Sequence, residues 1–265
     1  MPKLGEINYL KHIGAAGTQH ALDKPFSDGD CGRYLADLGA VLHLLPPPPA
    51  RILDLGVGPG WTSVFLARRG YEVVGQDICP DMIELANRNR DRYAALSARF
   101  VVQDYESMPY RGEFDGALFY DALHHAEDER TALAAVHAAL KPGGICLTIE
   151  PGEGHAAASA EVSAKLGVTE KDMPPHRVIE LARSVGFQSF RVYERSGEPA
   201  LLVGVDSRAP LWSPIPTRWR IAVGYARKAL RSLLKGVRES DREFLYGVPP
   251  DSVLRTGNVV WMQKW

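Results

Sequence analysis

The sequence predicts an α/β fold, a doubly wound Rossmann-like sheet, on three local observations. An apolar run at residues 52–55 has the length of a buried strand, and helical spacing follows at residues 62–69. Between them stands a glycine-rich turn, residues 56–60, and a second apolar run at residues 71–76 ends at Asp77. A strand, a tight turn, a helix and a second strand in this order form the first unit of an open parallel sheet.

The glycine turn and Asp77 together predict a cofactor site. Glycine has no Cβ, so it adopts positive φ and lets backbone N–H groups come close to a ligand. Thr62 or Ser63 is available to cap the following helix. Asp77 stands at the carboxyl end of its strand, where open α/β sheets bind ligands. Its carboxylate can accept both hydroxyls of a ribose, which indicates a nucleotide-type cofactor.

Two classes of cofactor use this layout, and Asp54 separates them. The dinucleotide fingerprint G-x-G-x-x-G requires a third glycine, but Trp61 or Ser63 stands there in the two frames of this sequence. A carboxylate at Asp54 would repel a pyrophosphate and can pair with an ammonium group. S-adenosylmethionine carries an ammonium group and no phosphate. The sequence therefore favours S-adenosylmethionine, and a nicotinamide-dependent oxidoreductase is the disfavoured alternative.

On these residues the chain resembles the class I S-adenosylmethionine-dependent methyltransferases, in the broad group that acts on small molecules and glycans. Val57 departs from the family pattern, which more often has a smaller residue or cysteine there. The resemblance covers about residues 50–195 and implies a seven-stranded sheet. The positions that match the first motif of the family are Ile52, Leu53, Asp54, Leu55, Gly56, Gly58 and Gly60.

Later elements follow in the family's order. Strands are expected at residues 100–103, 114–120 and 187–193, and a helix at residues 128–140. The segment Lys141-Pro142-Gly143-Gly144 is expected to end that helix before a strand at residues 145–150. In this family a seventh strand inserts antiparallel beside the sixth. Residues 201–205 and 259–264 both fit that strand, and the second range is favoured.

The resemblance also implies which residues bind the cofactor. Asp77 would bind the ribose, Ile78 would pack against adenine, and Asp104 would accept a hydrogen bond from the adenine amine. Tyr105 would lie beside Asp104, and Tyr120 would contact the methionine end or the acceptor. The full predicted cofactor set is Asp54, Gly56, Gly58, Gly60, Asp77, Ile78, Asp104, Tyr105 and Tyr120.

The catalytic candidates follow two neighbouring strands. Transfer to a hydroxyl requires removal of a proton, and histidine titrates in the right range for this task. His124 and His125 come after the fourth strand, and Glu150 and His155 come after the fifth. The His-His pair has an equal alternative, local packing around the methionine end. A metal site formed by His125, Glu150 and His155 is chemically conceivable, but no close-spaced metal motif occurs and none is expected.

The predicted organisation has four parts: an N-terminal helical lid at residues 1–49, the methyltransferase core at 50–205, a basic helical insertion at 206–255 and a final core strand at 256–265. Within the insertion, Arg227, Lys228 and Arg231 lie on a helix with basic and apolar faces. A solvated surface is the main interpretation of this helix. Attraction to an anionic acceptor or peripheral contact with a membrane is the alternative.

Composition limits the partners. The net charge of −1 provides no global field for nucleic acid, and no Asn-Pro-Pro-Tyr motif follows the fourth strand. The three cysteines match neither a zinc site nor a disulfide framework, and no signal peptide or membrane-spanning run occurs, so a cytoplasmic protein is expected. The predicted function is methyl transfer to oxygen of a small-molecule or sugar-containing acceptor. The alternatives are a lipid-, quinone- or amine-type acceptor and a cofactor-binding scaffold without turnover.

Overall fold

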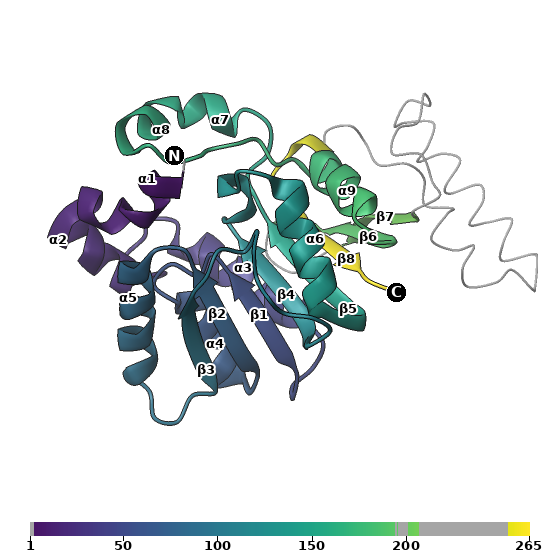
Figure 1. Cartoon of the computed structure of the whole chain (residues 1–265), viewed down its shortest axis with the longest axis horizontal. Helices are drawn as coiled ribbons and strands as arrows, with labels where there is room; N and C mark the ends of the chain where they lie inside the picture. The colour runs from purple at the N-terminus through teal and green to yellow at the C-terminus, as the bar shows by residue number, and fades with distance from the viewer. Residues whose placement is uncertain (1–2, 194, 196–200, 207–253) are drawn as a thin grey trace, which may run out of the picture.

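The computed structural model describes residues 3–193, 195, 201–206 and 254–265, and this part of the chain contains one mixed sheet (Figure 1). Its eight described strands have the order β3-β2-β1-β4-β5-β8-β6-β7. Neighbours β1, β2, β3, β4 and β5 pair in parallel, whereas β8 is antiparallel to both β5 and β6. The strands are β1 (Arg51–Leu55), β2 (Glu72–Asp77), β3 (Ala98–Val102), β4 (Phe114–Tyr120), β5 (Leu140–Ile149), β6 (Ser189–Tyr193), β7 (Leu201–Asp206) and β8 (Val259–Gln263).

The α/β sheet of the class I type is confirmed, with one additional strand at its edge. Of the two ranges considered for the antiparallel seventh strand, β8 takes the place between β5 and β6. The other range forms β7, which pairs antiparallel with the outer side of β6. The order along the sheet reverses at β1, because β2 and β4 lie on its two sides. That reversal is where open α/β sheets bind ligands.

Helices cover both faces of the sheet. On one face, Phe119 of β4 packs in a cluster with Val136 of α6 and Ile179 of α9. On the other face, Leu118 packs in a cluster with Leu38 of α3 and Leu66 of α4. Neighbouring residues of a strand point to opposite faces, so the apolar run of β4 serves both clusters. The helices of the core are α3 (Cys31–Leu44), α4 (Trp61–Arg69), α5 (Pro80–Asp91), α6 (Glu129–Ala139) and α9 (Pro175–Ser184).

The remaining helices lie toward the carboxyl ends of the central strands. Figure 1 shows α1 close to α8, which follows β5 and α7, and α2 close to one end of α5. Between β4 and α6 there is one 3₁₀ turn, η1 (Leu123–His125). The bounds of these helices are α1 (Lys3–Ile7), α2 (Tyr9–Leu22), α7 (His155–Ala158) and α8 (Ala160–Leu166).

Two local expectations were wrong. The hydroxyls of Thr62 and Ser63 do not cap α4; both donate to Asp54 Oδ2 at 2.6 Å, because a buried carboxylate lies within their reach. The helix expected to reach residue 140 ends at Ala139, and Lys141-Pro142-Gly143-Gly144 already belongs to β5. The pairing of β5 with β4 shifts register between Phe114 and Gly116, which accommodates this segment within the strand.

The predicted basic insertion lies almost entirely outside the described residues, as do Arg227, Lys228 and Arg231. Its helical character and both interpretations of its basic face stay predictions. Across the ranges that the structure describes, the helices are too short or too polar to cross a membrane.

Candidate active site

A cavity of about 300 Å³ opens at the carboxyl ends of β1, β2 and β4. Seven of the nine predicted cofactor residues line it, and Gly60 and Asp104 do not. Further side chains come from the N-terminal segment, from the end of β4 and from the segment that includes α8. The lining residues from the predicted cofactor set are Asp54, Gly56, Gly58, Asp77, Ile78, Tyr105 and Tyr120.

The glycine turn owes its shape to packing as well as to its backbone. Gly56, Gly58 and Gly60 have φ of 67°, 51° and 74°. The backbone of a residue with a Cβ is strained at these values. A Cβ at Gly56 would lie 2.7 Å from the Cβ of Ala122, and one at Gly60 would lie 2.8 Å from the Cβ of Ala86. At Gly58 nothing lies within 4 Å. Gly60 therefore allows the turn to pack closely against Ala86 of α5, while Gly58 faces open space in the cavity.

Asp77 is held at the edge of the cavity by two backbone amides. Gly58 N–H donates to Oδ2 and Cys79 N–H donates to Oδ1, each at 2.9 Å. Burial raises the pKa of Asp77, and these two hydrogen bonds oppose that shift. A carboxylate oxygen can accept more than one hydrogen bond, so both oxygens can still receive a ligand hydroxyl.

Asp54 is the buried anchor of the turn. Its carboxylate accepts hydrogen bonds from the hydroxyls of Thr62 and Ser63, and burial raises the pKa of Asp54 to about 6. Asp104, by contrast, points to the N-terminal segment: it pairs with Lys3 and accepts the N–H of Glu106. The predicted contact between Asp104 and adenine stays a prediction.

Two tyrosines present rings to the cavity and use their hydroxyls elsewhere. Tyr105 donates to the carbonyl of Ala122 at 3.0 Å. Tyr120 donates to Asp37 Oδ2 at 2.7 Å, and its ring meets Trp61 edge to face at 5.3 Å. Both tyrosines therefore form part of the cavity wall, and the hydrogen bond of each hydroxyl fixes the orientation of its ring.

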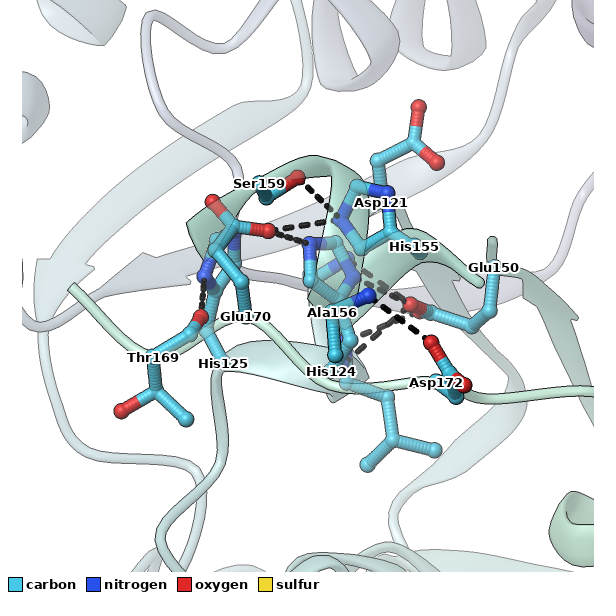
Figure 2. Close-up of polar contacts among 12 residues, drawn as sticks. Asp121, His124, His125, Glu150, His155, Ala156, Ser159, Thr169, Glu170 and Asp172 are labelled. Atoms are coloured by element: carbon cyan, nitrogen blue, oxygen red, sulfur yellow. Dashed lines mark hydrogen bonds and ion pairs between the residues drawn. The ribbon is translucent and has the colours of Figure 1, made fainter. Parts of the chain in front are cut away.

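His124 lies between two carboxylates, behind the cavity (Figure 2). Its Nδ1 is 2.7 Å from Glu150 Oε2, and its Nε2 is 3.4 Å from Glu170 Oε2. Burial alone would lower the pKa of His124, but the hydrogen bonds with Glu150 and Glu170 raise it to about 10. An imidazolium cannot accept a proton, so at neutral pH His124 acts as a fixed cation.

Glu150 and His155 also face away from the cavity lining. Glu150 accepts the N–H groups of Ala122 at 3.2 Å, Leu123 at 2.8 Å and His124 at 3.3 Å, which fixes the start of η1. His155 Nε2 lies 2.7 Å from Glu170 Oε2. Glu170 itself lines the cavity, and its partners hold the pKa of its carboxyl at about 2 despite burial.

His125 is the one member of the predicted catalytic set, all of which the structure describes, that lines the cavity. Its Nδ1 donates to the carbonyl of Thr169 at 2.6 Å and lies 3.4 Å from Glu6 Oε1. A carbonyl only accepts, so Nδ1 carries the proton and Nε2 of the neutral ring is the basic atom. Burial lowers the pKa of His125, yet the hydrogen bond with Glu6 and other charges leave it above the ordinary value.

The sequence reasoning placed Asp121 at the rim of the site without assigning it a role, and it missed two further acidic residues of the lining, Glu6 and Glu170. Asp121 has a φ of 46°, uncommon outside glycine, and its carboxylate lies 3.6 Å from Arg195. Its place directly after β4 was a usable signal. Glu6 and Glu170 belong to segments without a motif, so no local signal could have identified them.

Among the residues that the structure describes, one group of donors is close enough together for a metal ion. His124, His125 and Glu170 each offer an atom, and these atoms lie within 4.8 Å of one another. Both ring nitrogens of His124 already face carboxylate oxygens, so an ion would have to displace a proton held by two acids. That no metal is needed stays a prediction.

Comparison with known proteins identifies the family. A family model described as a methyltransferase domain matches residues 52–144. A ubiquinone biosynthesis O-methyltransferase from Ruegeria pomeroyi is 30% identical over 216 residues, which are 76% of this chain and 79% of that protein. The chain belongs to the class I S-adenosylmethionine-dependent methyltransferases.

Other members of the methyltransferase family match over less of their length. A demethylmenaquinone methyltransferase from Thermus thermophilus is 34% identical over 114 residues. This match covers 42% of the present chain and 51% of that relative. The phosphoethanolamine N-methyltransferase 2 of Haemonchus contortus, solved with S-adenosylmethionine, has a TM-score of 0.61 at 17% identity. That match covers 98% of this chain and 58% of the other, and it shows likeness of fold.

The cofactor of this methyltransferase family fits the cavity. S-adenosylmethionine is a nucleoside with a charged amino-acid end, and the lining offers a fixed carboxylate at Asp77, an apolar side chain at Ile78 and an open backbone at Gly58. A Cβ at Gly56 would strike Ala122, so the chain keeps the turn tight beside this space.

Proposed function

We propose that this protein transfers a methyl group from S-adenosylmethionine to a hydroxyl oxygen of a small-molecule acceptor, with His125 as the base. The observation that carries the proposal is the orientation of His125. Its Nδ1–H is bonded to the Thr169 carbonyl at 2.6 Å, and the residue lines the same cavity as the glycine turn. The name of the Ruegeria relative, an O-methyltransferase, supports oxygen as the methylated atom.

The residues of the turn would hold the cofactor. Asp77 would accept the ribose hydroxyls, Ile78 and Tyr105 would flank the nucleoside, and Asp54 would attract the ammonium group. When bound, S-adenosylmethionine supplies a methyl group on a positively charged sulfur. The task of the chain is then alignment of an acceptor oxygen with that methyl group and removal of the hydroxyl proton.

The proton step falls to His125. Nε2 accepts the proton of the acceptor hydroxyl, and the ring becomes an imidazolium whose Nδ1–H stays on Thr169. The carboxylates of Glu6 and Glu170 in the lining then stabilise the new positive charge. His124 lacks this ability because its raised pKa keeps it protonated, and His155 and Glu150 do not line the cavity.

The lining favours an acceptor with a flat or ring-shaped body. Rings of Tyr9, Tyr34, Trp61 and Tyr120 line the cavity, and Val162 and Val168 add apolar surface. Aromatic rings bind other rings by offset or edge contacts and also pack on sugars. A phenol- or quinone-type hydroxyl and a sugar hydroxyl both suit this surface, and the names of the quinone-pathway relatives support the first.

A second candidate is methylation of an amine. Glu6, Asp121 and Glu170 place three carboxylates in the lining, and such groups attract an ammonium. The same His125 would remove a proton from the amine before attack.

Transfer of label from methyl-labelled S-adenosylmethionine tests the proposal. Wild type, His125→Ala and the control His43→Ala, an exposed residue of α3, are incubated with a catechol, an amino sugar, a primary amine and fractionated cell extract. Label in an O-methyl product, lost in His125→Ala alone, is the expected result. An N-methyl product selects the amine candidate. Cofactor binding by calorimetry without transfer to any fraction contradicts the proposal and favours a binding protein.

A further inference from the structure

We propose that Glu6, on the N-terminal helix α1, is a positioning residue for His125, so that docking of α1 over the cavity completes the base. The inference rests on the proposed function, because it concerns the base assigned there. It adds a residue about 120 positions away in the sequence from the histidine that it serves, and it gives the N-terminal segment a role in the proton step.

A closed ring of contacts joins three separate segments. Glu6 Oε1 accepts the N–H of Thr169 at 2.9 Å and lies 3.4 Å from His125 Nδ1. The carbonyl of the same Thr169 accepts Nδ1–H of His125 at 2.6 Å. One side of Thr169 therefore orients the carboxylate and the other side orients the imidazole. Figure 2 shows the hydrogen bond between the His125 ring and the carbonyl of Thr169.

The docking of α1 is specific as well as close. A Cβ at Gly5 would lie 2.0 Å from the carbonyl oxygen of Gly167, so the two backbones touch there and only glycine fits. Lys3 forms ion pairs with Asp104, with Glu106 at 3.1 Å and with Glu127 at 3.8 Å. The contact at Gly5 and the pairs of Lys3 with Asp104 and Glu106 hold α1 in place immediately before Glu6.

The charged groups around His125 explain why Glu6 affects the pKa of His125 more specifically than the other carboxylates do. His124, whose ring is tilted by 41° to that of His125 with 3.9 Å between centroids, carries a positive charge that opposes protonation of His125. Glu170 favours protonation but is shared with His124 and His155. Asp77 faces His125 from β2 and is held by its two backbone amides. Glu6, whose Oε1 lies 3.4 Å from Nδ1, is thus the carboxylate that raises the pKa of His125 without being shared with another histidine.

In this arrangement, docking of α1 over the cavity and activation of His125 as a base occur together. With α1 away from the cavity, His125 faces the His124 cation without the carboxylate of Glu6, and Thr169 loses the acceptor that fixes its peptide. With α1 docked, the base gains its orientation and its compensating charge, and Glu6 and Tyr9 also complete the wall of the cavity. The chain would therefore remove a proton efficiently only after the acceptor has been enclosed.

Glu6→Gln separates positioning from simple anchoring. The amide oxygen of glutamine can still accept the N–H of Thr169, while the charge beside His125 is lost. We expect kcat to fall about tenfold and the pKa of the acidic limb of the kcat profile, assigned to His125, to fall by about one unit, as for loss of an opposite charge at this distance. The KM for S-adenosylmethionine should stay within about twofold, since Glu6 would serve the base and not the nucleoside.

The matched control is Glu127→Gln. Glu127 also pairs with α1, through Lys3, but it is half-exposed and does not line the cavity. It should leave kcat and the pH profile unchanged. Circular dichroism and thermal unfolding of both variants check that α1 and the core remain folded.

Titration of the histidine rings by nitrogen-15 NMR gives a readout that needs no turnover. A lower pKa of His125 in Glu6→Gln than in wild type supports the inference. An unchanged pKa of His125, or a pH profile that superposes on that of wild type after a drop in kcat, overturns it and leaves Glu6 as an anchor of the lid. Full activity of His125→Ala would instead overturn the proposed base, whatever Glu6 does.

Discussion

The imidazole of His124 and the carboxylate of Glu150 form a buried ion pair at 2.7 Å, with side chains that are 5% and 2% exposed. Glu150 also accepts three consecutive backbone N–H groups, so the pair joins the end of β4 to the end of β5 beneath the cavity. This pair belongs to the framework of the site, and it sets the position of the neighbouring His125.

Loss of one partner of this pair should destabilise the fold. Glu150→Gln leaves the His124 imidazolium beside a neutral amide, and breaking a buried pair typically costs about 3–5 kcal/mol. Urea unfolding measures the free energy. The control Glu153→Gln removes an exposed carboxylate that pairs with Arg255 at 3.3 Å and should cost less than about 1 kcal/mol. Equal stabilities of the two variants would contradict the assigned role.

The same pair predicts a fall in stability at alkaline pH. The pKa of His124 is about 10 in the folded protein against 6.5 for the free side chain, so the folded state binds the proton more tightly. Its contribution is complete below pH 6.5 and declines as the pH rises through 10. The stability difference between wild type and His124→Gln, measured by urea unfolding, should shrink over that interval. A constant or growing difference would show that the charge of His124 is not what stabilises the folded state.

The glycine turn predicts a graded response to alanine. Gly56→Ala combines a positive φ with a contact of 2.7 Å to Ala122, so it should weaken binding of S-adenosylmethionine at least tenfold. Gly112→Ala is the control, since its φ of 59° is similar and nothing lies within 4 Å of the added Cβ. It should cost about 1 kcal/mol of stability without a change in affinity. Calorimetric titration and thermal unfolding give the two quantities.

Asp77 offers a direct test of the nucleoside site. Asp77→Asn replaces a carboxylate that can accept two ribose hydroxyls, and hydrogen bonds to charged groups contribute about 1.5–3 kcal/mol. The affinity for S-adenosylmethionine should fall about tenfold to a hundredfold. Asp91→Asn, at the exposed end of α5, should leave the affinity unchanged. An unaltered affinity in Asp77→Asn would remove Asp77 from the site.

Local pattern was sufficient for the framework of the site. The alternation and length of apolar runs predicted the strands, and the spacing of glycines around Asp54 predicted the turn, because both depend on residues within a few positions of one another. The place of Asp77 followed from the rule that parallel strands end at one edge. For the antiparallel strand the sequence left two ranges open, and the favoured one forms β8 between β5 and β6.

The tertiary structure decided which of these side chains meet. His124 and His125 are adjacent and identical in the sequence, yet one lies behind the cavity between Glu150 and Glu170 and the other lines it. Thr62 and Ser63 turned to Asp54 instead of capping α4. A side chain's direction, its burial and its charge partners depend on segments far away along the chain, and Glu6 reaches His125 only once α1 has docked.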